Sequence, residues 1–192
     1  MLSGRLCNII VVNVHAPSEE KSDDVKVSFY EELDQVFDHF PKYHMKMLLG
    51  DVNAKVGREN IFKPTIRQES LHQGSNDNGF RLVNFVTSQN LVVKNTMFPH
   101  RNIHKYTWTS PDGKTDNQID HVLIDRRWHS SVLGVRSFRG ADCDTDHYLV
   151  IANVREGLAV GSINNNKIGN NYSSDVEHNE FDILTIMAAT IL

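Results

Sequence analysis

The segment at residues 45–53 constrains the fold of this chain more than any other. A short apolar run stops abruptly at Gly-Asp-Val-Asn, residues 50–53. Such a run, bounded by turn-forming residues, is typical of a buried strand. Asp51 and Asn53 point to the same side if the strand geometry continues. Two interpretations are equally favoured: a strand that delivers both side chains to a site, or an ordinary β-turn rich in Gly, Asp and Asn.

The segments before this strand predict a strand–helix–strand unit. Residues 5–14 are mostly apolar and predict a first strand that is covered on both faces. After Ser22, apolar residues recur at helical spacing and predict an amphipathic helix that ends at Pro41. Two strands joined in this way are expected to be parallel neighbours.

The remaining segments predict further helices and strands. Residues 54–78 form a long polar loop, which is typical of functional or disordered segments. Asn78 is expected to cap a helix whose buried face starts at Phe80, and a short strand follows at 91–93. Residues 106–110 and 118–124 are predicted to pair as a hairpin across a Pro-Asp-Gly turn, before strands at 132–138 and 148–154.

Composition limits the domain organisation. The 192 residues, 40% of them hydrophobic, suffice for one substantial core, while the asparagine-rich segment 156–192 predicts a disordered tail whose apolar end, from 183, forms a frayed helix. A net charge of −4 neither indicates nor excludes nucleic-acid binding. Cys7 and Cys143 form no CxxC motif, which favours a reducing, intracellular compartment. No stretch approaches a membrane span, so no membrane partner is expected, and the sequence specifies no oligomeric state.

Polar side chains follow or begin four of the predicted strands. They are His15, Asp51 with Asn53, Asp120, and Asp146 with His147. Strand ends of an open α/β sheet converge at one rim. Carboxylates and imidazoles gathered there are costly unless a cation or a phosphate joins them. The sequence therefore favours a phosphate-handling site, and the alternative is that each group lies in a separate turn.

Five short motifs occur in an order that resembles a known superfamily. They are Asn-Val-His-Ala-Pro at 13–17, Gly-Asp-Val-Asn at 50–53, Tyr-Thr-Trp at 106–108, Ile-Asp-His at 119–121 and Thr-Asp-His at 145–147. Residues 5–155 resemble the endonuclease/exonuclease/phosphatase superfamily, in particular the endonuclease domain of non-LTR retrotransposons and craniofacial development protein 2-like proteins. The resemblance implies a four-layer α/β sandwich, in which two packed mixed β-sheets are flanked by helices, over residues 1–155.

The resemblance also implies catalytic roles. Asp51 would orient or deprotonate the attacking water, and Asn53 would hold the scissile phosphate. His147 would contact a phosphate oxygen and stabilise charge in the transition state. Asp120 would keep the His147 imidazole protonated, because a nearby carboxylate favours the charged form. His15 would donate to the phosphate in a pH-dependent way.

Cofactor and partners follow from the same resemblance. Mg²⁺, with Mn²⁺ as the alternative, would be bound by Asp51 and Asp146. DNA would be the partner, which implies a nuclear protein. Trp108 and Asn117 are the candidate DNA contacts, although a tryptophan in a strand is more often a core residue.

The superfamily's first two motifs, an asparagine and a metal-binding glutamate, find no match in the few residues ahead of the first strand. We therefore expect an N-terminally truncated domain. Two functions remain open: a Mg²⁺-dependent phosphodiester hydrolase of the DNA endonuclease type, derived from a retrotransposon, or a catalytically inactive relic that at most binds DNA or protein.

Overall fold

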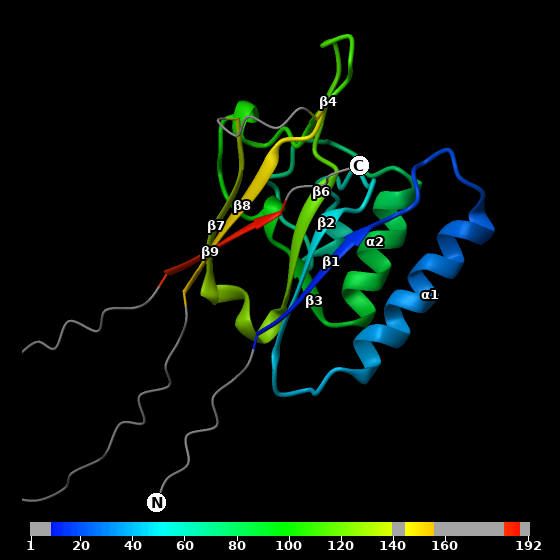
Figure 1. Cartoon of the computed structure of the whole chain (residues 1–192), viewed down its shortest axis with the longest axis vertical. Coiled ribbons are helices and arrows are strands. Elements are labelled where there is room, and N and C mark those ends of the chain that lie inside the picture. The colour runs from blue at the N-terminus through cyan, green and yellow to red at the C-terminus, as the bar shows by residue number, and fades with distance from the viewer. Residues whose placement is uncertain (1–8, 140–144, 156–182, 189–192) are drawn as a thin grey trace, which may run out of the picture.

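A computed structural model describes residues 9–139, 145–155 and 183–188 (Figure 1). β1 (Ile9–His15) and β2 (Met45–Asp51) are parallel neighbours joined by α1 (Asp23–His39). The predicted strand–helix–strand unit is therefore confirmed. The central sheet has the order β1-β2-β6-β3, in which β6 (Asp120–Asp125) is antiparallel to both β2 and β3 (Leu91–Val93).

One face of the central sheet is covered by helices. α1 and α2 (Asp77–Ser88) lie side by side on it (Figure 1). Their apolar stripes pack against alternate residues of the strands, because successive side chains of a strand point to opposite faces. The core of this layer includes Phe37, Leu48, Leu82, Val86 and Leu123.

The other face of the central sheet packs on a second sheet. This sheet has the order β7-β8-β9, formed by β7 (Val132–Phe138), β8 (Leu149–Arg155) and β9 (Ile183–Ala188). Met47, Val122, Val135 and Val150 meet between the two sheets. The predicted α/β sandwich with two packed sheets is confirmed, and the described residues build its helix layer, central sheet and second sheet.

The predicted hairpin partner is wrong. β4 (Trp108–Thr109) pairs with the short β5 (Asp116–Asn117), while β6 enters the central sheet between β2 and β3. All six residues of β6 are buried. A strand that is buried on both faces belongs inside a sandwich and not in an exposed hairpin. Among the described residues, four short 3₁₀ helices complete the connections: η1 (Asn60–Phe62), η2 (Lys94–Thr96), η3 (Asn102–His104) and η4 (Arg126–Ser131).

Three further expectations are corrected. β1 is an edge strand with Val11 46% exposed, and it is not covered on both faces. The cap of α2 is Asn76, whose side chain accepts from the backbone N–H of Gly79 at 2.8 Å, while Asn78 lies in the first helical turn. Phe80 is 43% exposed because it falls outside the buried stripe of α2.

The C-terminal segment differs from its prediction. Residues 183–188 form β9, antiparallel to β8, where a frayed helix was expected. Strand pairing decides this, because β8 offers an open row of backbone groups that an apolar segment can complete. The rest of the predicted tail, and both cysteines, lie outside the described residues. No described helix has the length and apolar character needed to cross a bilayer.

Candidate functional site

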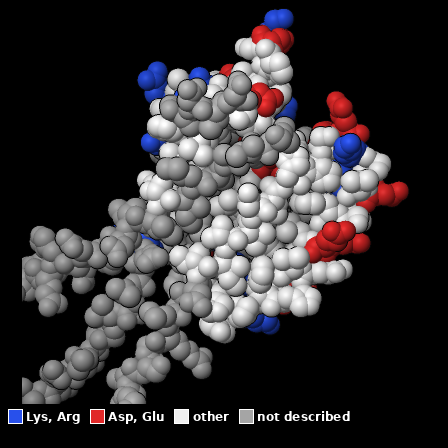
Figure 2. Space-filling model, viewed as in Figure 1, with Lys and Arg blue, Asp and Glu red and all other residues white. Residues whose placement is uncertain are grey.

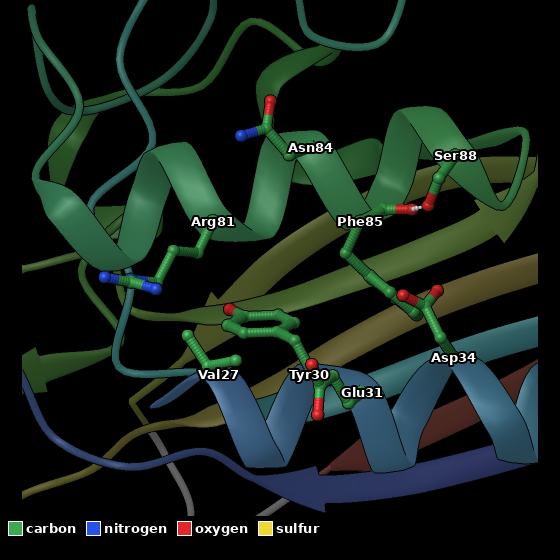
Figure 3. A pocket seen from close by; sticks show the side chains of 8 residues that line it. All are labelled: Val27, Tyr30, Glu31, Asp34, Arg81, Asn84, Phe85 and Ser88. Atoms are coloured by element: carbon green, nitrogen blue, oxygen red, sulfur yellow. Dashed lines mark hydrogen bonds between the residues drawn. The ribbon is translucent and has the colours of Figure 1, made fainter. Parts of the chain in front are cut away.

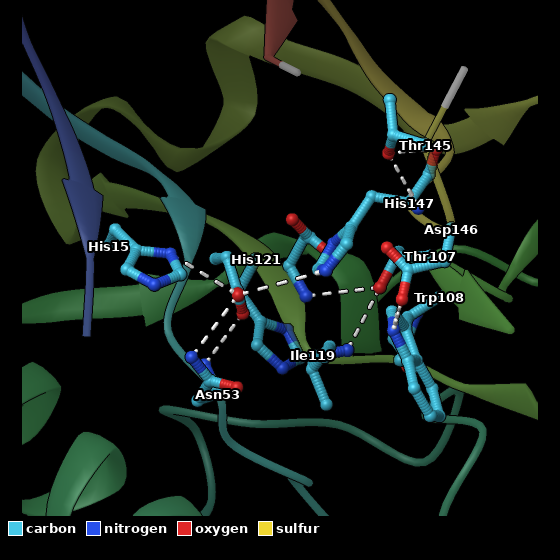
Figure 4. A network of polar contacts seen from close by, with 12 residues as sticks. His15, Asn53, Thr107, Trp108, Ile119, His121, Thr145, Asp146 and His147 are labelled. Atoms are coloured by element: carbon cyan, nitrogen blue, oxygen red, sulfur yellow. Dashed lines mark hydrogen bonds and ion pairs between the residues drawn. The ribbon is translucent and has the colours of Figure 1, made fainter. Parts of the chain in front are cut away.

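Strand register places three of the predicted residues side by side. In the central sheet His15 is paired with Asp51, and Asp51 with Asp120, across β1, β2 and β6. His147 reaches them from the second sheet, since it lies just before β8 and forms a bridge with Trp108. Figure 4 shows the resulting polar network, with the His15, Asn53 and His147 side chains converging.

The turn after β2 orients the Asp51 carboxylate. Asp51 is 2% exposed, and its Oδ1 accepts from the backbone N–H of Asn53 at 2.9 Å. The Asn53 side chain donates from Nδ2 to Asp51 Oδ2 at 3.1 Å and to the carbonyl oxygen of Ala16 at 2.8 Å. Asn53 adopts φ +49°, a conformation that asparagine tolerates better than most residues. Both amide hydrogens of Asn53 are thus used to hold Asp51 and the end of β1.

His147 is held by one carboxylate and faces another. Its Nδ1 donates to Asp120 Oδ2 at 3.1 Å, and its Nε2 lies 3.9 Å from Asp51 Oδ2. A separation of 3.9 Å exceeds hydrogen-bond distance, so Nε2 remains available to an incoming oxygen atom. His15 lies at the rim, with Nδ1 3.4 Å from Asp51 Oδ2 and a side chain that is 52% exposed.

The electrostatics of the cluster favour a carboxylate that accepts protons and an imidazole that keeps one. Burial raises the pKa of Asp51, and the neighbouring Asp120 charge raises it further, against the Asn53 N–H and the two histidines. Burial lowers the pKa of His147, but the hydrogen bond to Asp120 and the charges of Asp120, Asp51 and Asp146 outweigh it and leave that pKa raised.

Asp146, Trp108 and Asn117 lie outside the cluster formed by His15, Asp51, Asp120 and His147. Asp146 Oδ2 accepts from the indole Nε1 of Trp108 at 2.7 Å. Trp108 is half-buried and pairs in register with Asn117 in the β4–β5 ribbon. In Figure 4 the Trp108 and Asp146 side chains lie to one side of His147. One oxygen of the Asp146 carboxylate therefore accepts a hydrogen bond from a side chain of its own chain.

The fit to a divalent cation rests on Asp51. Within residues 9–139, 145–155 and 183–188, no three His, Cys, Asp or Glu side chains gather in a way that could hold a metal. Mg²⁺, however, is commonly bound through one or two carboxylates, with water and substrate phosphate completing its shell. The buried Asp51, whose pKa is raised in part by a second carboxylate, suits one such ligand.

Two supporting residues were given no role from the sequence, although both stand in the five motifs. His121 is 1% exposed, and its Nε2 donates to the carbonyl oxygen of Ala54 at 2.9 Å. Thr107 Oγ1 accepts from the N–H groups of Ile119 and Asp120, at 2.9 and 3.0 Å, and so fixes the start of β6. The His121 bond joins residues 67 positions apart in the chain, which no local pattern predicts, whereas Thr107 lies in a segment that was expected to pair with residues 118–124.

The remaining surface features lie away from this network. A pocket between α1 and α2 is lined by Val27, Tyr30, Glu31, Asp34, Arg81, Asn84, Phe85 and Ser88 (Figure 3). It contains none of the predicted site residues. On the face seen in Figure 2, acidic side chains gather over α1 and basic ones are scattered.

Comparisons with known proteins agree with the motifs. No protein-family model matches the chain. Craniofacial development protein 2 of Bos taurus is 38% identical over 157 residues, which cover 82% of this chain and 26% of that protein. The protein of that name from Tragulus javanicus is also 38% identical over 157 residues, 82% of this chain and 27% of the relative. The chain thus spans about a quarter of the length of these curated relatives.

Solved structures share the fold. An AP endonuclease from Archaeoglobus fulgidus matches 75% of this chain and 60% of its own, with TM-score 0.53 and 18% identity. The 3′-5′ exonuclease NExo from Neisseria meningitidis matches 73% of this chain and 59% of its own, with TM-score 0.51 and 22% identity. NExo has also been solved as a 3′ phosphatase bound to a product DNA hairpin, with TM-score 0.50, 22% identity and 74% and 59% of the two chains covered. The chain belongs to the family of craniofacial development protein 2, and it shares the fold of these nuclease structures.

Proposed function

We propose that this chain is a phosphodiester hydrolase of the DNA endonuclease type. The observation that carries the proposal is the arrangement of Asp120, His147 and Asp51, in which one buried carboxylate holds an imidazole that faces a second. The nuclease names of the solved structures with this fold, one of them bound to a DNA hairpin, support DNA as the substrate.

In this proposal His147 stabilises the phosphate. Asp120 accepts from Nδ1 and so favours the imidazolium form, in which Nε2 is also a donor. Nε2 would donate to a non-bridging phosphoryl oxygen, where negative charge develops during attack. A preorganised donor in a buried site stabilises such charge without a reorganisation cost.

Asp51 would act on the attacking water. The water oxygen forms a bond to phosphorus, one of its protons passes to Asp51, and the bond to the leaving oxygen breaks, which then takes a proton from solvent. A carboxylate whose pKa is raised by burial is a better proton acceptor than an exposed one. Asn53 would keep the carboxylate oriented, because it binds both of its oxygens.

The rim of the site would contact the rest of the substrate. His15, with a half-exposed side chain beside Asp51, would donate to a phosphate oxygen when protonated. Trp108 and Asn117, which face each other across the β4–β5 ribbon, would contact DNA next to the cleaved bond. Mg²⁺ or Mn²⁺, with Asp51 as its protein ligand, would supply additional positive charge beside the phosphoryl oxygens.

Nicking of supercoiled plasmid tests the proposal. Purified protein is incubated with Mg²⁺, with Mn²⁺ or with EDTA, beside Asp51→Asn and His147→Ala. Matched controls are Asp24→Asn and His39→Ala, which alter the exposed face of α1. Nicking that requires the metal, is lost in both site variants and persists in both controls would support hydrolysis. Equal background in all five proteins would reject it.

A second candidate is a non-catalytic module that binds DNA or protein. The observation that favours it is the hydrogen bond from the Trp108 indole to Asp146, which engages one oxygen of a carboxylate expected at the metal. DNA binding without nicking, with an affinity that falls as salt rises, would support this candidate. Acting on DNA, with or without cleavage, would place the protein in the nucleus, which a fluorescent fusion of the full chain would check.

A further inference from the structure

Asn78, in the first turn of α2, touches two loops of the site without being part of it. Its side chain is 2% exposed. Its Nδ2 donates to the carbonyl oxygen of Pro17 and to that of Asn53, each at 3.0 Å. Pro17 follows the strand end that carries His15, and Asn53 belongs to the turn that carries Asp51. One amide group thus joins the two loops.

The unpaired oxygen of Asn78 indicates that the amide hydrogens, and not the amide oxygen, explain why the residue is an asparagine. Its Oδ1 is buried and has no hydrogen-bond partner among the described residues. A buried carbonyl without a partner lowers stability, whereas an apolar side chain of the same size would avoid that loss. Packing alone therefore favours leucine at this position. The two donated hydrogen bonds explain an asparagine.

The start of α2 is docked directly on the loop after Asn53. The Asn76 side chain accepts from the backbone N–H of Lys55 at 2.9 Å, and the Asn76 N–H donates to the Lys55 carbonyl oxygen at 3.2 Å. A Cβ atom on Gly79 would lie 2.1 Å from that same oxygen. The helix end and the loop therefore move together, and Asn78 has a fixed place beside Asn53.

We propose that Asn78 is a positioning residue for the Asp51 carboxylate, acting through Asn53. By binding the Asn53 carbonyl oxygen it holds the left-handed backbone at φ +49°. That backbone aims the Asn53 N–H and side chain at the two oxygens of Asp51. The catalytic consequence rests on the proposed function, whereas the effect on the turn does not depend on it.

Three variants separate positioning from stability. Asn78→Leu removes both donors and keeps the number and branching of the side-chain heavy atoms, and Asn78→Ser keeps a single hydroxyl donor. Val83→Ala is the matched control, because Val83 is fully buried on the same helix and packs in the core. It lowers the melting temperature without removing a hydrogen bond of the turn.

The first measurement is amide hydrogen exchange in the native protein. It follows the N–H of Asn53, which donates to Asp51 Oδ1, and that of Ala16, which donates to the Asp51 carbonyl oxygen. In Asn78→Leu we expect both to exchange at least about 10-fold faster, because local opening of the turn becomes easier. Asn78→Ser should show a smaller increase in the same two amides. In Val83→Ala the exchange rates of the Asn53 and Ala16 amides should change no more than those of other amides in the core.

The second measurement is the kinetics of plasmid nicking. We expect kcat to fall by about 10-fold or more in Asn78→Leu with KM nearly constant, since a misplaced catalytic group slows chemistry more than binding. Val83→Ala should keep the kcat of the parent protein below its melting temperature.

Two results would overturn the inference. Unchanged exchange at Asn53 and Ala16 in Asn78→Leu would do so whether or not the protein nicks DNA. Faster exchange with an unchanged kcat would show that Asn78 does not position the Asp51 carboxylate for catalysis. If the parent protein does not nick, faster exchange in Asn78→Leu still supports the hold on the turn, and the proposed function fails by itself. Should Asn78→Leu not fold, Asn78→Ser decides by the same two amides.

Discussion

The Nδ1 atom of His147 donates to Oδ2 of Asp120 across 3.1 Å, although Asp120 lies in the central sheet and His147 stands just before a strand of the second sheet. Asp120 begins β6 in the central sheet, and His147 precedes β8 in the second. The contact exists only because the two sheets pack face to face. The catalytic potential of the site therefore depends on the sandwich as a whole.

Asp120→Asn should abolish most of the nicking activity. The substitution keeps the size of the side chain but removes the charge that favours imidazolium at His147. We expect kcat to fall by about 100-fold or more, in the range lost when a general acid–base partner is removed. Plasmid nicking at constant pH measures this, with Asp24→Asn as the charge-matched control. Activity within about twofold of the parent would contradict the role given to Asp120.

Stability should fall between neutral pH and pH 4 because of His72. Burial lowers the pKa of His72 to about 4, and the charges of Lys55 and His121 add to the effect. His72 of the unfolded chain therefore takes up a proton near pH 6.5, whereas His72 of the folded protein takes one up only near pH 4. The stability that the neutral His72 contributes is present at neutral pH and is lost as the pH falls from about 6.5 to about 4. His72→Gln should make the melting temperature less dependent on pH over this window.

The control for this prediction is His39→Ala at the exposed end of α1. Its melting temperature should follow the pH curve of the parent protein. Thermal unfolding at pH 7 and pH 4.5 is sufficient. Nε2 of His72 accepts from the Gln118 N–H at 3.2 Å. If the melting temperatures of His72→Gln and of the parent fall in parallel with pH, protonation of this atom costs the folded protein no stability, and the prediction is wrong.

Gly50→Ala should destabilise the fold strongly. Gly50 has φ +130°, which L side chains rarely adopt, and a Cβ atom there would lie 2.1 Å from the Val14 carbonyl oxygen of the neighbouring strand. Strain and clash together predict a loss of at least ~2 kcal/mol in the free energy of unfolding. Gly134→Ala in β7 is the control, because no atom lies within 4 Å of its Cβ. Urea unfolding of both variants distinguishes a general glycine effect from this contact.

Trp108 and Asp146 should be energetically coupled. Trp108→Phe removes the indole N–H that Asp146 Oδ2 accepts at 2.7 Å, and Asp146→Asn removes the charge. A hydrogen bond to a charged acceptor contributes about 1.5–3 kcal/mol, so each variant should lose part of that stability and the double variant little more. A double-mutant cycle by chemical denaturation measures the coupling. Strictly additive losses would mean that the bond contributes nothing in solution.

Local patterns were sufficient wherever one segment determines its own structure. The apolar spacing after Ser22 predicted α1, and the run at 45–53 predicted β2, because burial of one stripe or one short run follows from periodicity. The order of the five motifs indicated a relative of craniofacial development protein 2 before any geometry was known. The polar groups at strand ends were correctly expected to meet for His15, Asp51, Asp120 and His147.

Long-range pairing was decided only in three dimensions. The residues of β6 favour a hairpin with β4 when read locally, yet they lie between β2 and β3 because both of their faces can be buried there. The donors of Asn78 likewise find partners in segments that no sequence spacing predicts. Periodicity encodes which face of a segment avoids water, whereas the partner of that face depends on every other segment that competes for the same core. The sequence by itself therefore determined most helices and strands and the functional groups that they carry. The tertiary structure decided which of these polar groups are hydrogen-bond partners.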